Sequence, residues 1–293
     1  MYLETVTALL HSNIKSGSLR FVTHIMVLLV LFGCRKVENK MARLPSSATG
    51  IDFVNALDPA GDLNIIKYLY YYNGGGVAVG DINNDGLEDL FFTANQGEDQ
   101  LYLNTGNLQF RNITRSSGIT NHQASWSNGA VFADVNGDGW EDIFVCKVGN
   151  YLFLQGHNLL YLNNQDNTFS EVAVDVGLAF SGFSTQASFF DYDRDGDLDM
   201  YLMNHAVHTT RSYQDASTRQ IPDPLAGDRL YRNQLVESDS LYFHDVTREA
   251  GIFSSAQGYG LGLVTSDINQ DGWMDIYVGN DFHEDDYLYL NQK

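Results

Sequence analysis

The sequence has few cysteines, prolines and basic residues. Of its 293 residues, two are cysteine and four are proline, and acidic residues outnumber basic ones 37 to 17, for a net charge of −20. Two cysteines exclude a disulfide scaffold, and the low proline content argues against a disordered or collagenous chain. Nucleic-acid binding and charge-driven attachment to anionic lipid both need clustered Lys and Arg, so neither is expected. The chain is 44% hydrophobic and 13% aromatic, which suffices for one large core or two modest ones.

Residues 1–33 are typical of an export signal. Lys15 and Arg20 precede an apolar run from Phe21 to Gly33. The run has about 13 residues, whereas a membrane-spanning helix needs about 20. A basic segment followed by a short apolar segment and a small residue predicts a secretory signal peptide. We therefore expect an exported protein.

The segment Leu31-Phe32-Gly33-Cys34 resembles a bacterial lipoprotein box. In that class the cysteine becomes the lipidated N-terminus, so Cys34 is predicted to anchor the chain to the outer membrane or cell surface, with residues 34–45 as a linker. The alternatives are a plain cleaved signal, or a buried strand or helix with an incidental cysteine. Cys146 then has no partner, and it is expected to be a buried, unreactive thiol.

Four nine-residue segments share the pattern D-x-[ND]-x-D-G-x-x-D, and we name them the first to fourth loops. They are Asp81–Asp89, Asp134–Asp142, Asp191–Asp199 and Asp267–Asp275. These loops hold 16 of the 37 acidic residues, so the negative charge is clustered. Their first aspartates are 53, 57 and 76 residues apart, a period that suits propeller blades.

The sequence around the loops repeats as well. Short apolar strands precede and follow each loop, and a third strand then carries the pattern Leu-Tyr-x-Asn, which ends at Asn104, Asn163, Asn233 and Asn291. A fourth strand begins with phenylalanine in the first three repeats. Short aromatic and β-branched runs between turn residues indicate strands, and four strands per repeat describe a propeller blade. We therefore predict an all-β propeller over residues 46–293, with three complete blades and a partial fourth.

Two long segments and the end of the chain depart from the repeat. Extra residues lie around Asp52–Tyr72 and in an insertion at His205–Gly227, and such loops on a rigid scaffold usually carry binding specificity. Lys293 follows Asn291 before a fourth blade would form its outermost strand. Propellers have about four to eight blades, so we expect a fragment of a longer propeller. The alternative is that Gly50-Ile51 supplies the missing strand.

The four loops are predicted to bind calcium. Ca²⁺ takes six to eight oxygen ligands, and positions 1, 3, 5 and 9 of the pattern offer side-chain oxygens, with position 7 offering its backbone carbonyl. The ligands would be Asp81, Asn83, Asp85, Leu87 and Asp89; Asp134, Asn136, Asp138, Trp140 and Asp142; Asp191, Asp193, Asp195, Asp197 and Asp199; and Asp267, Asn269, Asp271, Trp273 and Asp275. Solvated Asx turns are the alternative. The third loop has a carboxylate where the others have Asn, so we expect it to bind most tightly.

These repeats resemble the FG-GAP or VCBS repeat of integrin α chains. The similarity extends to bacterial surface proteins that resemble cartilage acidic protein and carry an ASPIC/UnbV-type C-terminus. It rests on residues 73–81, 182–196, 223–233 and 279–286 as well as on the loops. The resemblance implies a calcium-stabilised propeller on an exported protein, with only the loop ligands carried over.

Two functions are compatible with this sequence. The first is a surface module that binds a protein or glycan, which we expect rather than an enzyme. The second is a calcium-dependent, lyase-like enzyme that degrades polysaccharides. Its candidate acid–base and charge-neutralising groups are His205, His208, Arg211, Tyr213, Asp215, His283, Glu284, Asp285 and Asp286. The plain alternative for these residues is a polar loop.

Overall fold

The computed structural model describes residues 40–120, 126–207, 219–282 and 284–293. The predicted signal peptide and Cys34 lie outside these residues and stay predictions. The chain divides into two units, Met1–Leu44 and Pro45–Lys293. Of the first unit, residues 40–44 are described, and they form no helix or strand. The account below concerns the second unit.

The second unit is built from four antiparallel sheets whose strands follow one another in sequence order. The first sheet holds β1 (Val77–Gly80), β2 (Asp89–Phe92), β3 (Gln100–Asn104) and β4 (Phe110–Asn112). The second holds β5 (Trp126–Ala133), β6 (Asp142–Val148), β7 (Leu159–Asn163) and β8 (Phe169–Glu171). The third holds β9 (Ser184–Phe190), β10 (Asp199–Asn204), β11 (Arg229–Asn233) and β12 (Phe243–Asp245). The fourth holds β13 (Gly260–Ser266), β14 (Asp275–Asn280) and β15 (Tyr287–Tyr289).

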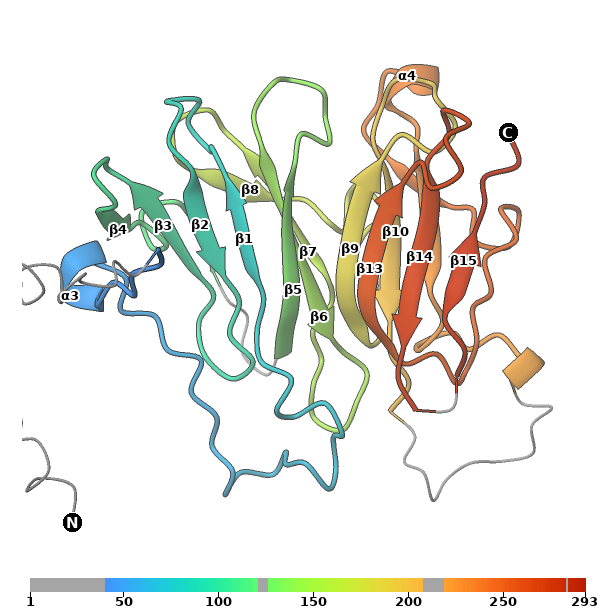
Figure 1. Ribbon diagram of the computed structural model, residues 1–293, viewed down its shortest axis with the longest axis horizontal. Helices are drawn as coiled ribbons and strands as arrows, with labels where there is room; N and C mark the ends of the chain where they lie inside the picture. The colour runs from blue at the N-terminus through green and yellow to red at the C-terminus, as the bar shows by residue number, and fades with distance from the viewer. Residues whose placement is uncertain (1–39, 121–125, 208–218, 283) are drawn as a thin grey trace, which may run out of the picture. The chain divides into compact units, whose positions relative to one another are not determined.

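This architecture confirms the predicted all-β fold of three complete blades and a partial fourth. The helices in the described residues are α3 (Ser46–Thr49) and α4 (Leu235–Ser238). None of the described helices is long and apolar enough to cross a membrane. The sheets stand side by side through their first strands, because β1 contacts β5, β5 contacts β9 and β9 contacts β13 (Figure 1). Over the described residues, the sheets are arranged as successive propeller blades and do not close into a ring.

A hydrophobic core lies between each pair of neighbouring sheets. Side chains alternate along a strand, and β6 is buried along its whole length. Its Ile143 and Val145 join a core with the first sheet, whereas Phe144 and Cys146 join a core with the third. A further core joins the third and fourth sheets. Cys146 is fully buried, as expected, and burial raises the pKa of its thiol.

The segment before the first sheet packs against the other elements of this unit. Asp52 accepts a hydrogen bond from the Tyr102 hydroxyl at 2.7 Å, and Phe53 stacks on Phe92 with ring centroids 5.0 Å apart. Further along, Tyr68 is buried edge-on against Trp126. Leu63, Tyr68, Tyr70 and Tyr71 of this segment therefore belong to the core.

Gly50 lies against the first sheet. Its φ of 78° is left-handed, and a Cβ there would lie 2.4 Å from the carbonyl oxygen of Phe110. Gly118 and Gly177 stand in the same relation to the outer strands of the second and third sheets. Gly50-Ile51 therefore occupies the position next to the first sheet that these glycines occupy next to later ones. It does not pair with β15, which is the edge strand of its sheet among the described residues.

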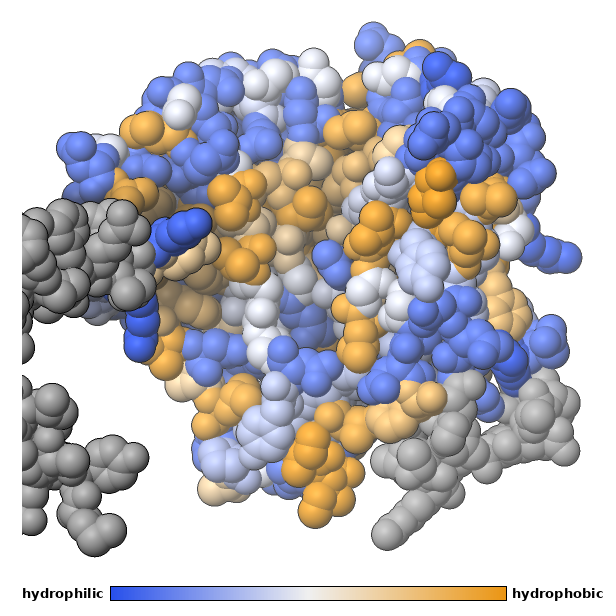
Figure 2. All heavy atoms as spheres, viewed as in Figure 1, coloured by the Kyte–Doolittle hydropathy of each residue, from blue (hydrophilic) through white to orange (hydrophobic). Residues whose placement is uncertain are grey.

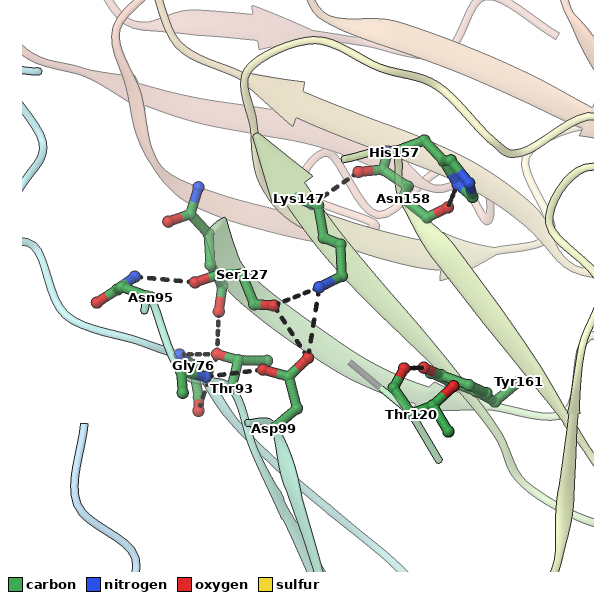
Figure 3. A network of polar contacts seen from close by, with 12 residues as sticks. Gly76, Thr93, Asn95, Asp99, Thr120, Ser127, Lys147, His157, Asn158 and Tyr161 are labelled. Carbon is green, nitrogen blue, oxygen red and sulfur yellow. Dashed lines mark hydrogen bonds and ion pairs between the residues drawn. The ribbon is translucent and has the colours of Figure 1, made fainter. Parts of the chain in front are cut away.

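A buried polar network links the first and second sheets (Figure 3). Lys147 Nζ on β6 lies 3.7 Å from Asp99 Oδ2 beside β3, and both side chains are 2% exposed. The Ser127 hydroxyl on β5 joins them, since it accepts from Lys147 at 2.8 Å and donates to Asp99 at 2.9 Å. The three groups partner one another, as buried polar groups must.

Candidate metal sites

The four loops occupy equivalent places in the four sheets. Each lies between the first and second strands, namely β1 and β2, β5 and β6, β9 and β10, or β13 and β14. Figure 1 shows these connections at the edge that also carries α4, and Figure 2 shows hydrophilic residues gathered there. The sheets thus present four acidic loops along one edge.

The aspartate at position 1 folds each loop back on itself. In the first loop, Asp81 accepts the N–H of Asp85 at 3.1 Å and that of Gly86 at 2.7 Å. Asp134 and Asp267 accept the equivalent N–H groups in the second and fourth loops. Gly86 has a φ of 82°, which favours glycine at position 6.

An asparagine at position 3 closes a set of hydrogen bonds within the loop. The amide oxygen of Asn83 accepts the N–H of Asp85, and its Nδ2 donates to Asp85 Oδ2 at 3.1 Å. Asn136 makes the same pair of bonds with Asp138. The amide donor therefore offsets part of the negative charge at position 5.

The third loop lacks this amide because position 3 is Asp193. Asp191 Oδ1, Asp193 Oδ1 and Asp195 Oδ2 are buried oxygens without a hydrogen-bond partner. These three carboxylates offer ligand atoms within 4.8 Å of one another. Burial, followed by the neighbouring Asp195 charge, raises the pKa of Asp193. A divalent cation would relieve this repulsion, and the donor set of hard oxygens suits Ca²⁺.

The aspartate at position 9 is buried and fastens the loop to the third strand of its sheet. Asp199 Oδ2 accepts the N–H of Tyr192 at 3.0 Å, and its Oδ1 accepts the N–H of Asn233 at 2.9 Å. Burial raises the pKa of Asp199 to about 8. Asp89, Asp142 and Asp275 accept the equivalent pairs of N–H groups. Position 9 is therefore a structural anchor, and its role as a ligand stays a prediction.

Position 7 contributes its backbone N–H to the loop. Leu87, Trp140, Asp197 and Trp273 each donate to the aspartate two residues earlier. The predicted coordination through their carbonyl oxygens stays a prediction.

The asparagine of the Leu-Tyr-x-Asn pattern connects neighbouring loops. Asn163 Nδ2 donates to the carbonyl of Ile82 in the first loop at 2.8 Å. Asn233 donates to Val135 in the second loop at 3.0 Å, and Asn291 to Tyr192 in the third at 2.7 Å. The sequence shows that this asparagine recurs in every repeat, but it does not indicate the hydrogen-bond partner of its side chain. The recurrence of the asparagine in all four repeats was the sequence signal that it has a structural role.

The described members of the candidate lyase set take part in structural contacts. His205 is fully buried: its Nε2 lies 2.8 Å from the Tyr68 hydroxyl and its Nδ1 3.2 Å from the Ala206 carbonyl. Burial lowers its pKa to about 4. Glu284 and Asp285 form ion pairs with Arg219: its Nε lies 3.0 Å from Glu284 Oε1, and its Nη2 lies 3.0 Å from Asp285 Oδ2.

Six members of that set remain, and one of them, Asp286, is among the described residues. Asp286 accepts the Tyr277 hydroxyl and the Asn280 N–H. His208, Arg211, Tyr213, Asp215 and His283 lie outside the described residues. His205 is thus a core residue, because it packs against the aromatic cluster around Tyr68.

Comparison with known proteins points to one family. Residues 81–145 and 150–202 match the FG-GAP-like repeat family. The chain is also similar to cartilage acidic protein 1 of Xenopus tropicalis (26% identical over 224 residues), Mus musculus (27% over 231) and Homo sapiens (27% over 229). These alignments cover 75–76% of this chain and 30–31% of the relatives. The chain therefore spans about 30% of the length of the curated relatives it matches.

Proposed function

We propose that this chain, whose residues 81–145 and 150–202 match the FG-GAP-like repeat family, is an exported calcium-binding propeller that serves as a surface module for a protein or glycan ligand. FG-GAP-like repeats often bind calcium and are typical of extracellular proteins. The lipid on Cys34 and the attachment to the outer membrane or cell surface form part of this proposal.

One observation carries the calcium assignment. The same acidic pattern recurs at the same junction of four successive sheets, and in the third loop four buried carboxylate oxygens, one each on Asp191, Asp193, Asp195 and Asp197, lack a hydrogen-bond partner. When bound, Ca²⁺ would supply positive charge and coordinate carboxylate oxygens. The loop residues would hold the ion. Because the position-9 aspartates bond each loop to the third strand of its sheet, a loop held by Ca²⁺ would also stabilise the sheet.

The proposed binding role is supported by the rigidity of the scaffold. The sheets are tied together by continuous cores and by the asparagine bonds between loops, so they form a rigid frame. Such a frame suits a module that displays loops to a partner. The buried position of His205 gives no support to the lyase alternative.

Thermal unfolding tests the calcium assignment. The chain is freed of metal with EGTA and melted with and without 2 mM CaCl₂, with MgCl₂ as control (the concentration is about 200 times a Kd of roughly 10 μM, the weak end of the sensor range). We expect Ca²⁺ to raise Tm by several degrees and Mg²⁺ to do so less. Equal melting in EGTA and Ca²⁺ would refute the assignment. Retention on protein and glycan arrays in Ca²⁺, compared with EGTA, then identifies the ligand class.

A further inference from the structure

A second group of carboxylates adjoins the third loop. Ligand atoms of Asp195, Asp197 and Glu237 lie within 4.8 Å of one another. Glu237 belongs to α4, outside the nine-residue pattern. Oxygens bound to one Ca²⁺ at about 2.4 Å lie at most about 4.8 Å apart, so this spacing permits a shared ion.

Asp197 supplies an independent indication that the group binds a ligand. The residue is only 6% exposed. Its Oδ2 accepts the N–H of Val236 at 3.0 Å, whereas its Oδ1 is buried and has no hydrogen-bond partner. A buried carboxylate oxygen without a partner is costly. One carboxylate oxygen of Asp197 is therefore fixed by a hydrogen bond, and the other has no hydrogen-bond donor.

The cationic side chains nearby do not satisfy this group. Arg232 Nε lies 3.8 Å from Glu237 Oε1, and that nitrogen makes no hydrogen bond. The Arg194 guanidinium lies over the Trp273 ring, 5.1 Å from its centroid, and so faces the fourth loop. Glu237 is exposed and its 3.8 Å ion pair with Arg232 is long, so Arg232 neutralises its charge only in part.

We propose that Asp195, Asp197 and Glu237 form a second divalent-cation site, and that Asp195 is shared with the ion held by Asp191 and Asp193. The proposal rests on the proposed function, because it takes the third loop to be a cation site. A carboxylate shared by two divalent ions about 3.5–4 Å apart is an established arrangement. Five clustered carboxylates carry more charge than one divalent ion neutralises, and two ions nearly balance it.

This second site is specific to the third repeat. Position 7 is Leu87, Trp140 or Trp273 in the other loops, and none of these side chains ligates a hard cation. Four residues after the Leu-Tyr-x-Asn asparagine, the first and second repeats have Leu108 and Asn167 where the third has Glu237. The third repeat alone therefore combines both additional carboxylates among the three complete repeats.

Calcium stoichiometry tests the second site. The full chain is titrated to saturation with CaCl₂, and the bound ions are counted by equilibrium dialysis and native mass spectrometry. We expect Glu237→Gln to lose one ion per chain and Asp197→Asn to lose the same ion, so that the double variant loses one and not two. Glu88→Gln is the matched control, because it removes an exposed charge at position 8 of the first loop, which is not a predicted ligand, and it should retain the full count.

Any of the following results would overturn the second site. An unchanged count in Glu237→Gln does so outright, and an unchanged count with weaker affinity would place Glu237 on the loop's own ion. Loss of an ion from Glu237→Gln but not from Asp197→Asn would remove Asp197 from the site. Absence of any calcium binding by the unmodified chain would overturn the proposed function as well, so the two failures are distinguishable.

Discussion

Asn163 donates its side-chain amide to the carbonyl oxygen of Ile82, 2.8 Å away in the preceding loop. The same asparagine gives its backbone N–H to Asp142, the anchor of its own loop. One residue thus ties two neighbouring loops together. Because repeat proteins derive much of their stability from contacts between neighbours, this bond makes the acidic edge a connected structure.

Replacement of Asn163 by alanine should destabilise the chain by about 2 kcal/mol, because it leaves the buried Ile82 carbonyl without its donor. Asn104 is the matched control: its amide donates to Glu88 of its own loop, and it is more exposed. We expect Asn104→Ala to cost under about 1 kcal/mol. Denaturant unfolding of both variants measures the difference, and equal costs would show that the bond between loops contributes little.

The strands were predictable from the sequence, whereas most side-chain roles were not. Apolar runs around four loops of one shared pattern locate the strands, because alternation and turn chemistry are local properties. Asp142 stands at position 9 of the pattern, but one of its two backbone donors is Val135 in its own loop and the other is Asn163 on β7, so its anchoring role depends on tertiary structure.

Tertiary placement also explains where the sequence misled. His205 belongs to an insertion rich in polar residues, yet it is buried against Tyr68 and Tyr70, because the segment before the first sheet packs over it. The sequence did not indicate Glu237, because it is distant in sequence from Asp197; the hydrogen bond from the Val236 N–H to Asp197 joins α4 to the loop.

Lys147 and Asp99 provide a test of the contact between the first two sheets. Lys147→Met leaves the Asp99 carboxylate buried without its cation, and we expect a loss of about 3 kcal/mol in the free energy of unfolding. Chemical denaturation at neutral pH measures this.

Adding Asp99→Asn to that variant should restore about half of the loss or more, because the neutral amide needs no cation. The second sheet already has Asn158 at the equivalent position, where its Oδ1 accepts a backbone N–H as Asp99 Oδ1 does. If the double variant is no more stable than Lys147→Met, the lysine acts through packing and not through charge.

Asp228 should make stability depend on pH. It is buried, accepts the Asn204 N–H and the Tyr201 hydroxyl, and burial raises its pKa from 3.8 to about 7. The folded chain therefore binds a proton more readily than the unfolded chain between these values. Its contribution to stability is fully present below pH 3.8 and is lost as the pH rises through 7, by up to about 4 kcal/mol.

The variant Asp228→Asn isolates that contribution, since it removes the titrating group. Measured by urea unfolding in EGTA from pH 4 to pH 8, the unmodified chain should lose stability relative to the variant as the pH rises. A difference that is constant across this range would mean that Asp228 remains charged in the folded chain throughout.

The third loop differs from the others at position 3, and Asp193→Asn makes it match them. The new amide can donate to Asp195 Oδ2, as Asn83 donates to Asp85, so the metal-free chain should gain about 1 kcal/mol. Loss of one carboxylate should weaken calcium binding at this loop about tenfold. Melting in EGTA and calorimetric titration with CaCl₂ measure the two effects, and Asn83→Asp should reverse both at the first loop. A variant that melts lower in EGTA would show that favourable contacts, and not uncompensated charge, determine the energetics of Asp193.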